Sequence, residues 1–114
     1  MKLIDKNITV AELMEMSKKM FSGLVKAVVD VEKEIMVVDA ELHADCEFFL
    51  LENDSRQENL WGINFYPERF GADGFVEFDS MINMRPSQGN RSRGVDDPNV
   101  RKKIISIVNK LVVA

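Results

Sequence analysis

The pattern of apolar and polar residues predicts a helix near each end of the chain. Between residues 10 and 21, apolar side chains recur every three or four positions, as they do on one face of an α-helix. The segment Thr9-Val10-Ala11-Glu12 has the form of a capping box that would begin this helix, and Gly23 would end it. Near the other end, Asp97 followed by Pro98 is a typical helix start, and an apolar stripe follows it.

Four segments alternate between apolar and polar residues, a pattern typical of strands with one buried face. They are residues 24–32, 35–42, 60–66 and 75–84. A short polar turn separates the first two, which predicts a hairpin. The segment 44–53 has four consecutive apolar residues that do not discriminate by period, and we favour a helix begun by Asp45 over a further strand.

The order of these elements predicts an α+β fold. Consecutive hairpins imply a four-stranded, mainly antiparallel sheet. We expect the N- and C-terminal helices to pack on one face of this sheet, which gives a two-layer sandwich. A chain of 114 residues, 46% hydrophobic and 30% charged, is long enough and apolar enough to form a single α+β domain over residues 1–114.

Charge and cysteine content narrow the classes of partner and compartment. A net charge of −4 argues against general binding to nucleic acids or to anionic membrane surfaces. One cysteine, Cys46, excludes an intramolecular disulfide and favours the reducing cytoplasm. No apolar run approaches the roughly 18 residues of a membrane helix, and the N-terminus lacks the apolar core of a signal peptide. We therefore expect a cytoplasmic protein without a membrane segment.

The segment 85–94, Arg-Pro-Ser-Gln-Gly-Asn-Arg-Ser-Arg-Gly, holds three arginines and no acidic residue. Guanidinium groups bind carboxylates and phosphates, glycines let the backbone approach a ligand, and the helix start that follows favours an anion. The predicted anion-binding residues are Arg85, Ser87, Gln88, Asn90, Arg91 and Arg93. The alternative is that the arginines hold the segment to the acidic face of the sheet or to a neighbouring subunit.

The polar face of the predicted sheet is rich in acidic and amide side chains. It comprises Lys26, Asp30, Asp39, Glu41, Asn64, Tyr66, Glu77, Asp79 and Asn83. A solvated face, or half of a dimer interface, is the ordinary outcome for such a surface. Clustered carboxylate and amide oxygens are also the ligands that Ca²⁺ and Mg²⁺ prefer, so a cation or catalytic carboxylate site is the second interpretation.

The single histidine, His43, lies in a run of acidic residues with the spacing of a strand face. Such a face could bind a transition metal, but one imidazole without a CxxC or HExxH pattern favours a histidine of a loop or of the core. For Cys46, a buried structural cysteine is favoured over a nucleophile. We predict no metal site and no cofactor.

Three runs of the sequence carry a resemblance to known proteins. They read AVVDVEKEIMVVDAELHAD, LWGINFYPE and EFDSMINMRPSQGNRSRGVDDP, in this order. Over nearly its whole length the chain resembles an uncharacterised family of short bacterial and archaeal proteins known only as a domain of unknown function. The resemblance implies a stand-alone intracellular domain, and it brings no activity, substrate or catalytic residue with it.

Two functions follow from these features as hypotheses. The first is a small cytosolic binding or interaction protein that self-associates as a homo-oligomer, and whose segment 85–94 engages an anionic group on a small ligand or on a sister subunit. The alternative is a metal-assisted hydrolase that uses carboxylates of the open sheet face. The alternative requires at least three of five residues to converge in a concave site. These are Asp39, Glu41, His43, Glu77 and Asp79.

Overall fold

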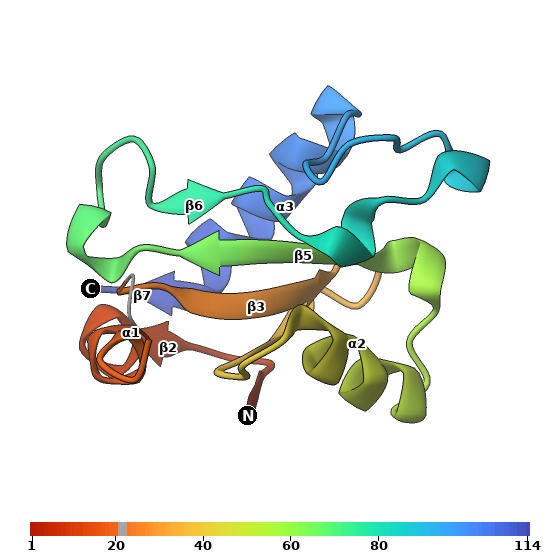
Figure 1. The fold of residues 1–114 in the computed structure, drawn as a ribbon. Helices are drawn as coiled ribbons and strands as arrows, with labels where there is room; N and C mark the ends of the chain where they lie inside the picture. The colour runs from red at the N-terminus through yellow and green to blue at the C-terminus, as the bar shows by residue number, and fades with distance from the viewer. Residues whose placement is uncertain (21–22) are drawn as a thin grey trace.

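An antiparallel sheet of five strands lies at the centre of the computed structural model, which describes residues 1–20 and 23–114 (Figure 1). In spatial order the strands are β1 (Lys2–Ile4), β4 (Ile35–Val38), β3 (Val25–Asp30), β5 (Leu60–Phe65) and β6 (Val76–Glu77). The prediction of four strands was therefore wrong by one. The additional strand, β1, has three residues, too few to show an alternating pattern.

The predicted hairpin between β3 and β4 is confirmed. Its register pairs Asp30 with Ile35. The buried carboxylate of Asp30 accepts hydrogen bonds from the backbone amides of Glu32 and Lys33, at 2.9 and 3.0 Å, and from the hydroxyl of Ser55 at 2.7 Å. One side chain thus organises the turn and ties it to the segment that leads into β5.

Both terminal helices bury their apolar stripes against the same face of the sheet. Helix α1 (Val10–Ser17) begins with a hydrogen bond from the Glu12 amide to the Thr9 hydroxyl at 3.1 Å, as the capping box predicts. It ends earlier than predicted, and residue 21, its predicted end, lies outside the described residues. Helix α3 (Pro98–Leu111) is capped by Asp97, and its apolar stripe joins the larger core cluster.

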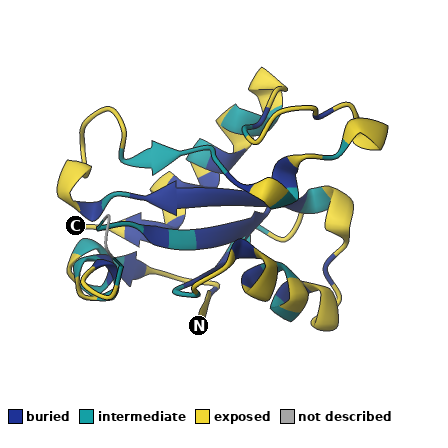
Figure 2. Ribbon diagram, in the orientation of Figure 1, coloured by how far each residue is buried: buried dark blue, intermediate teal, exposed yellow. Residues whose placement is uncertain are grey.

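Helix α2 (His43–Glu52) packs on the opposite face of the sheet, which confirms the helix favoured over a strand for this segment. Its Cys46 and Leu50 form a second, smaller core with Val28, Val37 and Leu60. The predicted two-layer sandwich is therefore correct for the sheet and the helices α1 and α3, but α2 adds a third layer that was not predicted. Figure 2 shows the central strands as the most buried part of the chain.

The remaining regular elements are short. A parallel pair joins β2 (Ile8–Thr9) to β7 (Val112–Val113). The described residues also form 3₁₀ turns, namely η1 (Gln57–Asn59), η2 (Pro67–Arg69), η3 (Met81–Asn83) and η4 (Pro86–Gln88). Among the described residues, no helix combines the length and apolarity needed to cross a lipid bilayer.

The strand predicted for residues 75–84 is much shorter in the structure, because only Val76–Glu77 of this segment pairs as a strand. Beyond β6, the side chain of Asn83 takes the place of a neighbouring strand. Its Oδ1 accepts from the Gly62 amide at 2.8 Å, and its Nδ2 donates to the Gly62 carbonyl at 2.9 Å. Segment 78–97 therefore closes the edge of β5 with side chains rather than with a backbone ladder.

Candidate functional site

A pocket lies on the α2 side of the sheet, just beyond the N-terminus of that helix. Its volume is about 440 Å³, and residues of β3, β5, β6, the start of α2 and the segment 79–82 line it together with Arg93. Helix α2 packs over Val28 and Leu60 and leaves the neighbouring part of the sheet face uncovered. The pocket is therefore the open remainder of a face that is otherwise covered.

Three polar residues form a row across the floor of this pocket. Lys26 of β3 pairs with Asn64 of β5, and Asn64 pairs with Glu77 of β6. Directly paired residues project from the same face of a sheet, and neighbouring strands lie about 4.8 Å apart. The row thus runs from a cation through an amide to a carboxylate over about 10 Å of sheet.

The carboxamide of Asn64 has a fixed orientation. Its Nδ2 donates to Glu77 Oε1 at 2.8 Å and to the Asp79 carbonyl at 3.2 Å, and both of these atoms act as acceptors. Its Oδ1 is buried and has no hydrogen-bond partner within the described part of the chain, and the residue is 5% exposed. An unpaired buried oxygen costs about 1–3 kcal/mol, and the neighbouring group at this point is the imidazole of His43, whose pKa Asn64 raises.

His43, the first residue of α2, fixes the helix to the sheet. Its Nε2 lies 2.9 Å from the Ile63 carbonyl oxygen, which only accepts, so Nε2 carries a hydrogen and the lone pair of the neutral ring is on Nδ1. Burial lowers the pKa of His43, and the charge of Lys26 lowers it further. These effects outweigh the hydrogen bond to the Ile63 carbonyl and the influence of Asn64, both of which raise the pKa. The imidazole is therefore neutral at neutral pH.

The N-terminus of α2 is open towards the pocket. Its N-cap residue is Leu42, which makes no side-chain capping hydrogen bond, and both His43 and Ala44 line the pocket. The first amides of a helix have no partner within the helix, and they carry the positive end of its dipole. This end of the pocket favours an anionic group.

Cationic side chains stand near the same opening. The ammonium group of Lys26 donates to the Glu41 carbonyl at 2.7 Å, which is a neutral acceptor and forms no ion pair with it. Arg93 lines the pocket as well, and its Nε donates to Asp79 Oδ1 at 2.6 Å. Positive potential therefore comes from the helix start and from Lys26, while Arg93 is neutralised by Asp79.

Comparison with protein families identifies the family of this chain but assigns no activity to it. A family described as "Protein of unknown function (DUF5674)" matches residues 2–111. The chain belongs to the DUF5674 family. This confirms the resemblance to a family of unknown function. No curated protein and no solved structure matches this DUF5674 chain.

Of the six residues predicted to bind an anion, Arg93 lines the α2 pocket of the DUF5674 chain, and the other five lie outside it in a loop closed by backbone pairing of Arg85 with Asn90. Arg85 lies beside the start of β5, where its guanidinium stacks 4.1 Å from the centre of the Trp61 ring. It donates to the Gln57 carbonyl and, at 2.8 Å, to the Leu60 carbonyl. Arg85 therefore serves the sheet edge and does not line the pocket.

The other members of the predicted set have separate positions. Asn90 is buried and donates to three carbonyls of its own loop, and Gln88 donates to the Glu58 carbonyl at 2.8 Å. Ser87 and Arg91 are exposed residues and do not line the pocket. Only Arg93 reaches the pocket, where its pairing with Asp79 agrees with the alternative that arginines bind the acidic face.

The five residues named for a metal-assisted hydrolase are divided as well. His43, Glu77 and Asp79 line the pocket, whereas Asp39 pairs with Lys19 at 2.8 Å and Glu41 lines a separate hollow. Among the described residues, no three histidine, cysteine, aspartate or glutamate side chains are placed to hold a metal ion. The hydrolase stays a prediction to which this geometry adds no support.

Cys46 has the environment of a structural residue. It lies in the smaller core beneath α2, and burial raises the pKa of its thiol to about 12. The thiol is therefore protonated at neutral pH and is a poor nucleophile.

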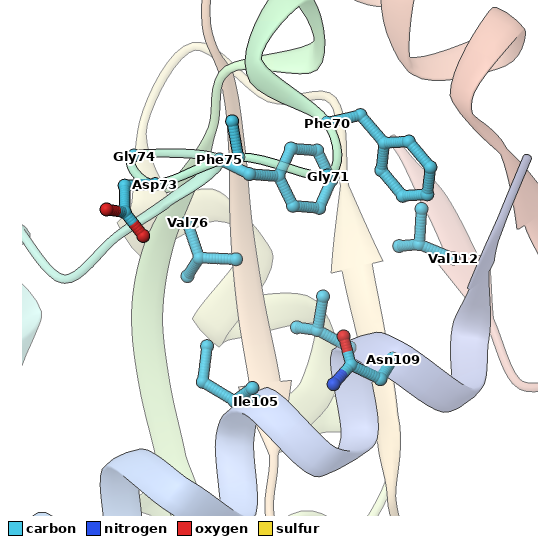
Figure 3. Close-up of a pocket in the computed structure, with 11 residues that line it drawn as sticks. Phe70, Gly71, Asp73, Gly74, Phe75, Val76, Ile105, Asn109 and Val112 are labelled. Carbon is cyan, nitrogen blue, oxygen red and sulfur yellow. The ribbon is translucent and has the colours of Figure 1, made fainter.

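A second, larger hollow of the DUF5674 chain is mostly apolar. Its volume is about 560 Å³, and it lies between the loop 70–76 and α3 (Figure 3). The rings of Phe70 and Phe75 meet edge to face with centres 5.2 Å apart, and Ile105, Asn109 and Val112 form the opposite wall. Ligand sites combine apolar walls with several convergent polar groups, and the α2 pocket fits that description better.

The residues on the floor of the α2 pocket were predicted from the sequence, but their positions relative to one another were not. Lys26, Asn64 and Glu77 all belonged to the predicted polar face, but their row depends on the pairing of β3 with β5, which one sequence does not give. The open start of α2 was missed, because Asp45 was taken as the cap. The available signal was Leu42, an apolar residue directly before the helix.

Proposed function

We propose that this DUF5674 protein binds a small molecule and engages its anionic group at the start of α2. The observation that carries the proposal is the convergence of the open helix N-terminus and the Lys26 ammonium on one pocket. A volume of about 440 Å³ falls within the common range of small-ligand sites, which is roughly 300–1,000 Å³. A cytoplasmic location, predicted from the single cysteine, is part of this proposal.

The arrangement supports binding more than catalysis. The Nε2 of His43 is engaged with a backbone carbonyl, the thiol of Cys46 is protonated, and Arg93 is paired with Asp79. The imidazole nitrogen and Arg93 are thus engaged by other groups of the protein, and the thiol is buried. The groups that remain for a ligand are hydrogen-bond donors and charges, which serve recognition.

Replacing Lys26 by methionine tests this function. The substitution keeps the length of the aliphatic part of the side chain and removes the ammonium group, so we expect affinity for acetate and inorganic phosphate to fall about tenfold or more. Titration by ¹H–¹⁵N NMR measures this, because the backbone amides of His43 and Ala44 report on the anion end directly. Equal affinity in the wild type and the variant would refute the proposal.

The matched control is Lys102→Met. Lys102 is exposed on α3, which packs on the opposite face of the sheet, so its loss lowers the net charge equally without touching the pocket. We expect the control to bind both anions as the wild type does. A comparable loss in both variants would mean that net charge, and not the pocket, attracts the anion.

We also propose that the protein self-associates through the outer side of α2 and the edge strand β1. Phe48 and Leu51 are exposed on α2, and Met1 and Leu3 are exposed beside them on the same face. Contiguous exposed apolar side chains of this kind are typical of interfaces. Because β1 is the last strand of the sheet, its outer edge can pair with β1 of a second copy.

Light scattering after size-exclusion chromatography tests self-association. We expect the wild type to elute as a dimer, and the Phe48→Ser/Leu51→Ser variant to elute with the mass of one chain. The control Val113→Ser removes an exposed apolar side chain of β7, away from α2, and is expected to remain dimeric. A monomeric wild type at high micromolar concentration would overturn this part of the proposal.

A further inference from the structure

Four charged side chains line the α2 pocket, and two of them neutralise each other. Arg93 and Asp79 form an ion pair at 2.6 Å. Lys26 and Glu77 form no ion pair with any of the described residues. The pocket therefore presents one uncompensated cation and one uncompensated anion, at opposite ends of the row that Asn64 completes.

The carboxylate of Glu77 is held in place with one oxygen left for a ligand. Both of its hydrogen bonds from the described residues go to Oε1, from Asn64 Nδ2 at 2.8 Å and from the Tyr66 hydroxyl at 3.3 Å. Burial and the charge of Glu77 raise the pKa of Tyr66, so its hydroxyl remains a donor. Because Glu77 is only partly exposed, an ammonium group at Oε2 would offset the cost of its desolvation.

Asn64 lies between the two charges and fixes the position of Glu77. Its Oδ1 faces away from Glu77, because Nδ2 is committed to Glu77 and to the Asp79 carbonyl. Oδ1 has no donor among the described residues. Because Oδ1 is buried, a ligand that spans the row is recognised by the charges at the two ends of the row.

We infer that the ligand is a zwitterion, with its anionic group at the start of α2 beside Lys26 and an ammonium group at Glu77. This inference rests on the proposed anion-binding function and adds the second charge. Leu42 and Met81, both more than half exposed, flank the pocket and give the carbon chain between the two charges an apolar surface. The ligand class is that of amino acids and ω-amino acids.

Matched pairs of compounds separate the two charges experimentally. Glycine, 4-aminobutyrate and 6-aminohexanoate are each compared with the carboxylate that lacks the amine, namely acetate, butyrate and hexanoate. Affinities are measured by NMR titration at constant ionic strength, for the wild type and for Glu77→Gln. We expect at least one amino acid to bind the wild type about tenfold more tightly than its partner.

The Glu77→Gln variant should abolish that preference and leave the affinity for the simple carboxylate within about twofold. Glutamine keeps an oxygen to accept from Asn64 and Tyr66, so the fold is expected to survive, which the NMR spectrum shows directly. Glu68→Gln is the control, since Glu68 is exposed and lies outside the pocket. It should retain the preference.

The outcomes distinguish the two levels of the proposal. If carboxylates bind and the amine adds nothing, or if Glu77→Gln keeps the preference, the zwitterion inference is wrong and the anion-binding function stands. If neither series shifts the His43 and Ala44 amides, both are wrong. The wild-type comparison decides the inference even if Glu77→Gln fails to fold.

Discussion

Replacing Asn83 by alanine is expected to lower the free energy of unfolding by about 3–5 kcal/mol, a large part of the stability of an ordinary domain. Asn83 is fully buried, and its carboxamide satisfies the amide and the carbonyl of Gly62 and also the Arg93 carbonyl. Alanine removes three hydrogen bonds and leaves buried backbone groups without partners, each of which costs about 1–3 kcal/mol.

Urea unfolding followed by tryptophan fluorescence measures this loss. Trp61 is the single tryptophan of the chain, is 5% exposed and precedes Gly62 in β5, so its emission reports on the affected edge. The control Asn109→Ala removes an exposed carboxamide from α3 and should change stability by less than about 0.5 kcal/mol. A loss below about 1 kcal/mol for Asn83→Ala would show that water or a rearranged loop replaces the carboxamide.

Replacing Gly62 by alanine is expected to destabilise the protein by about 3 kcal/mol through overpacking. A Cβ atom at this position would lie 2.6 Å from Ser80 Cβ, 2.7 Å from Ser80 Oγ and 3.2 Å from His43 Cδ2. Ser80 and His43 are both buried, so neither can move aside without disturbing its own contacts. Since both residues line the α2 pocket, we also expect weaker anion binding.

The double variant Gly62→Ala/Ser80→Gly tests the cause. Removing the Ser80 side chain clears the two shortest contacts, so the double variant should be more stable than Gly62→Ala alone, even though the hydrogen bond from the Ile82 amide to Ser80 is lost. Chemical denaturation of the two variants side by side provides the comparison. If Ser80→Gly brings no recovery, the steric explanation is incorrect.

Local signals carried most of the successful prediction of the fold. The capping box at Thr9, the Asp97-Pro98 helix start and the β3–β4 hairpin each depend on residues close together in sequence, and all three are confirmed. Segment 75–84 was mispredicted because its alternation continues past the point where pairing ends. Ser80 bonds to the nearby Ile82 amide, which competes with a strand ladder, and Asn83 bonds to Gly62 of β5 through its side chain.

The site required information that is not local. The polar residues of the sheet face were identified from alternation, but their grouping depends on strand register across 50 residues of chain. Arg85 shows the converse difficulty. From the local composition, Arg85 was predicted to bind an anion. In the structure its guanidinium donates to backbone carbonyls of Gln57 and Leu60. No sequence motif indicates such a contact.

The side-chain closure of β5 has a consequence for solubility. An open, long sheet edge is a template on which further chains add as strands, and repeated addition produces fibrils. Here Asn83 and Arg85 occupy the backbone groups of Gly62 and Leu60, and β6 offers a pairing length of two residues. If two copies pair through β1, the assembly would therefore stop at two chains. The opposite edge of each sheet, at β6, offers too few unpaired backbone groups for a further strand to add.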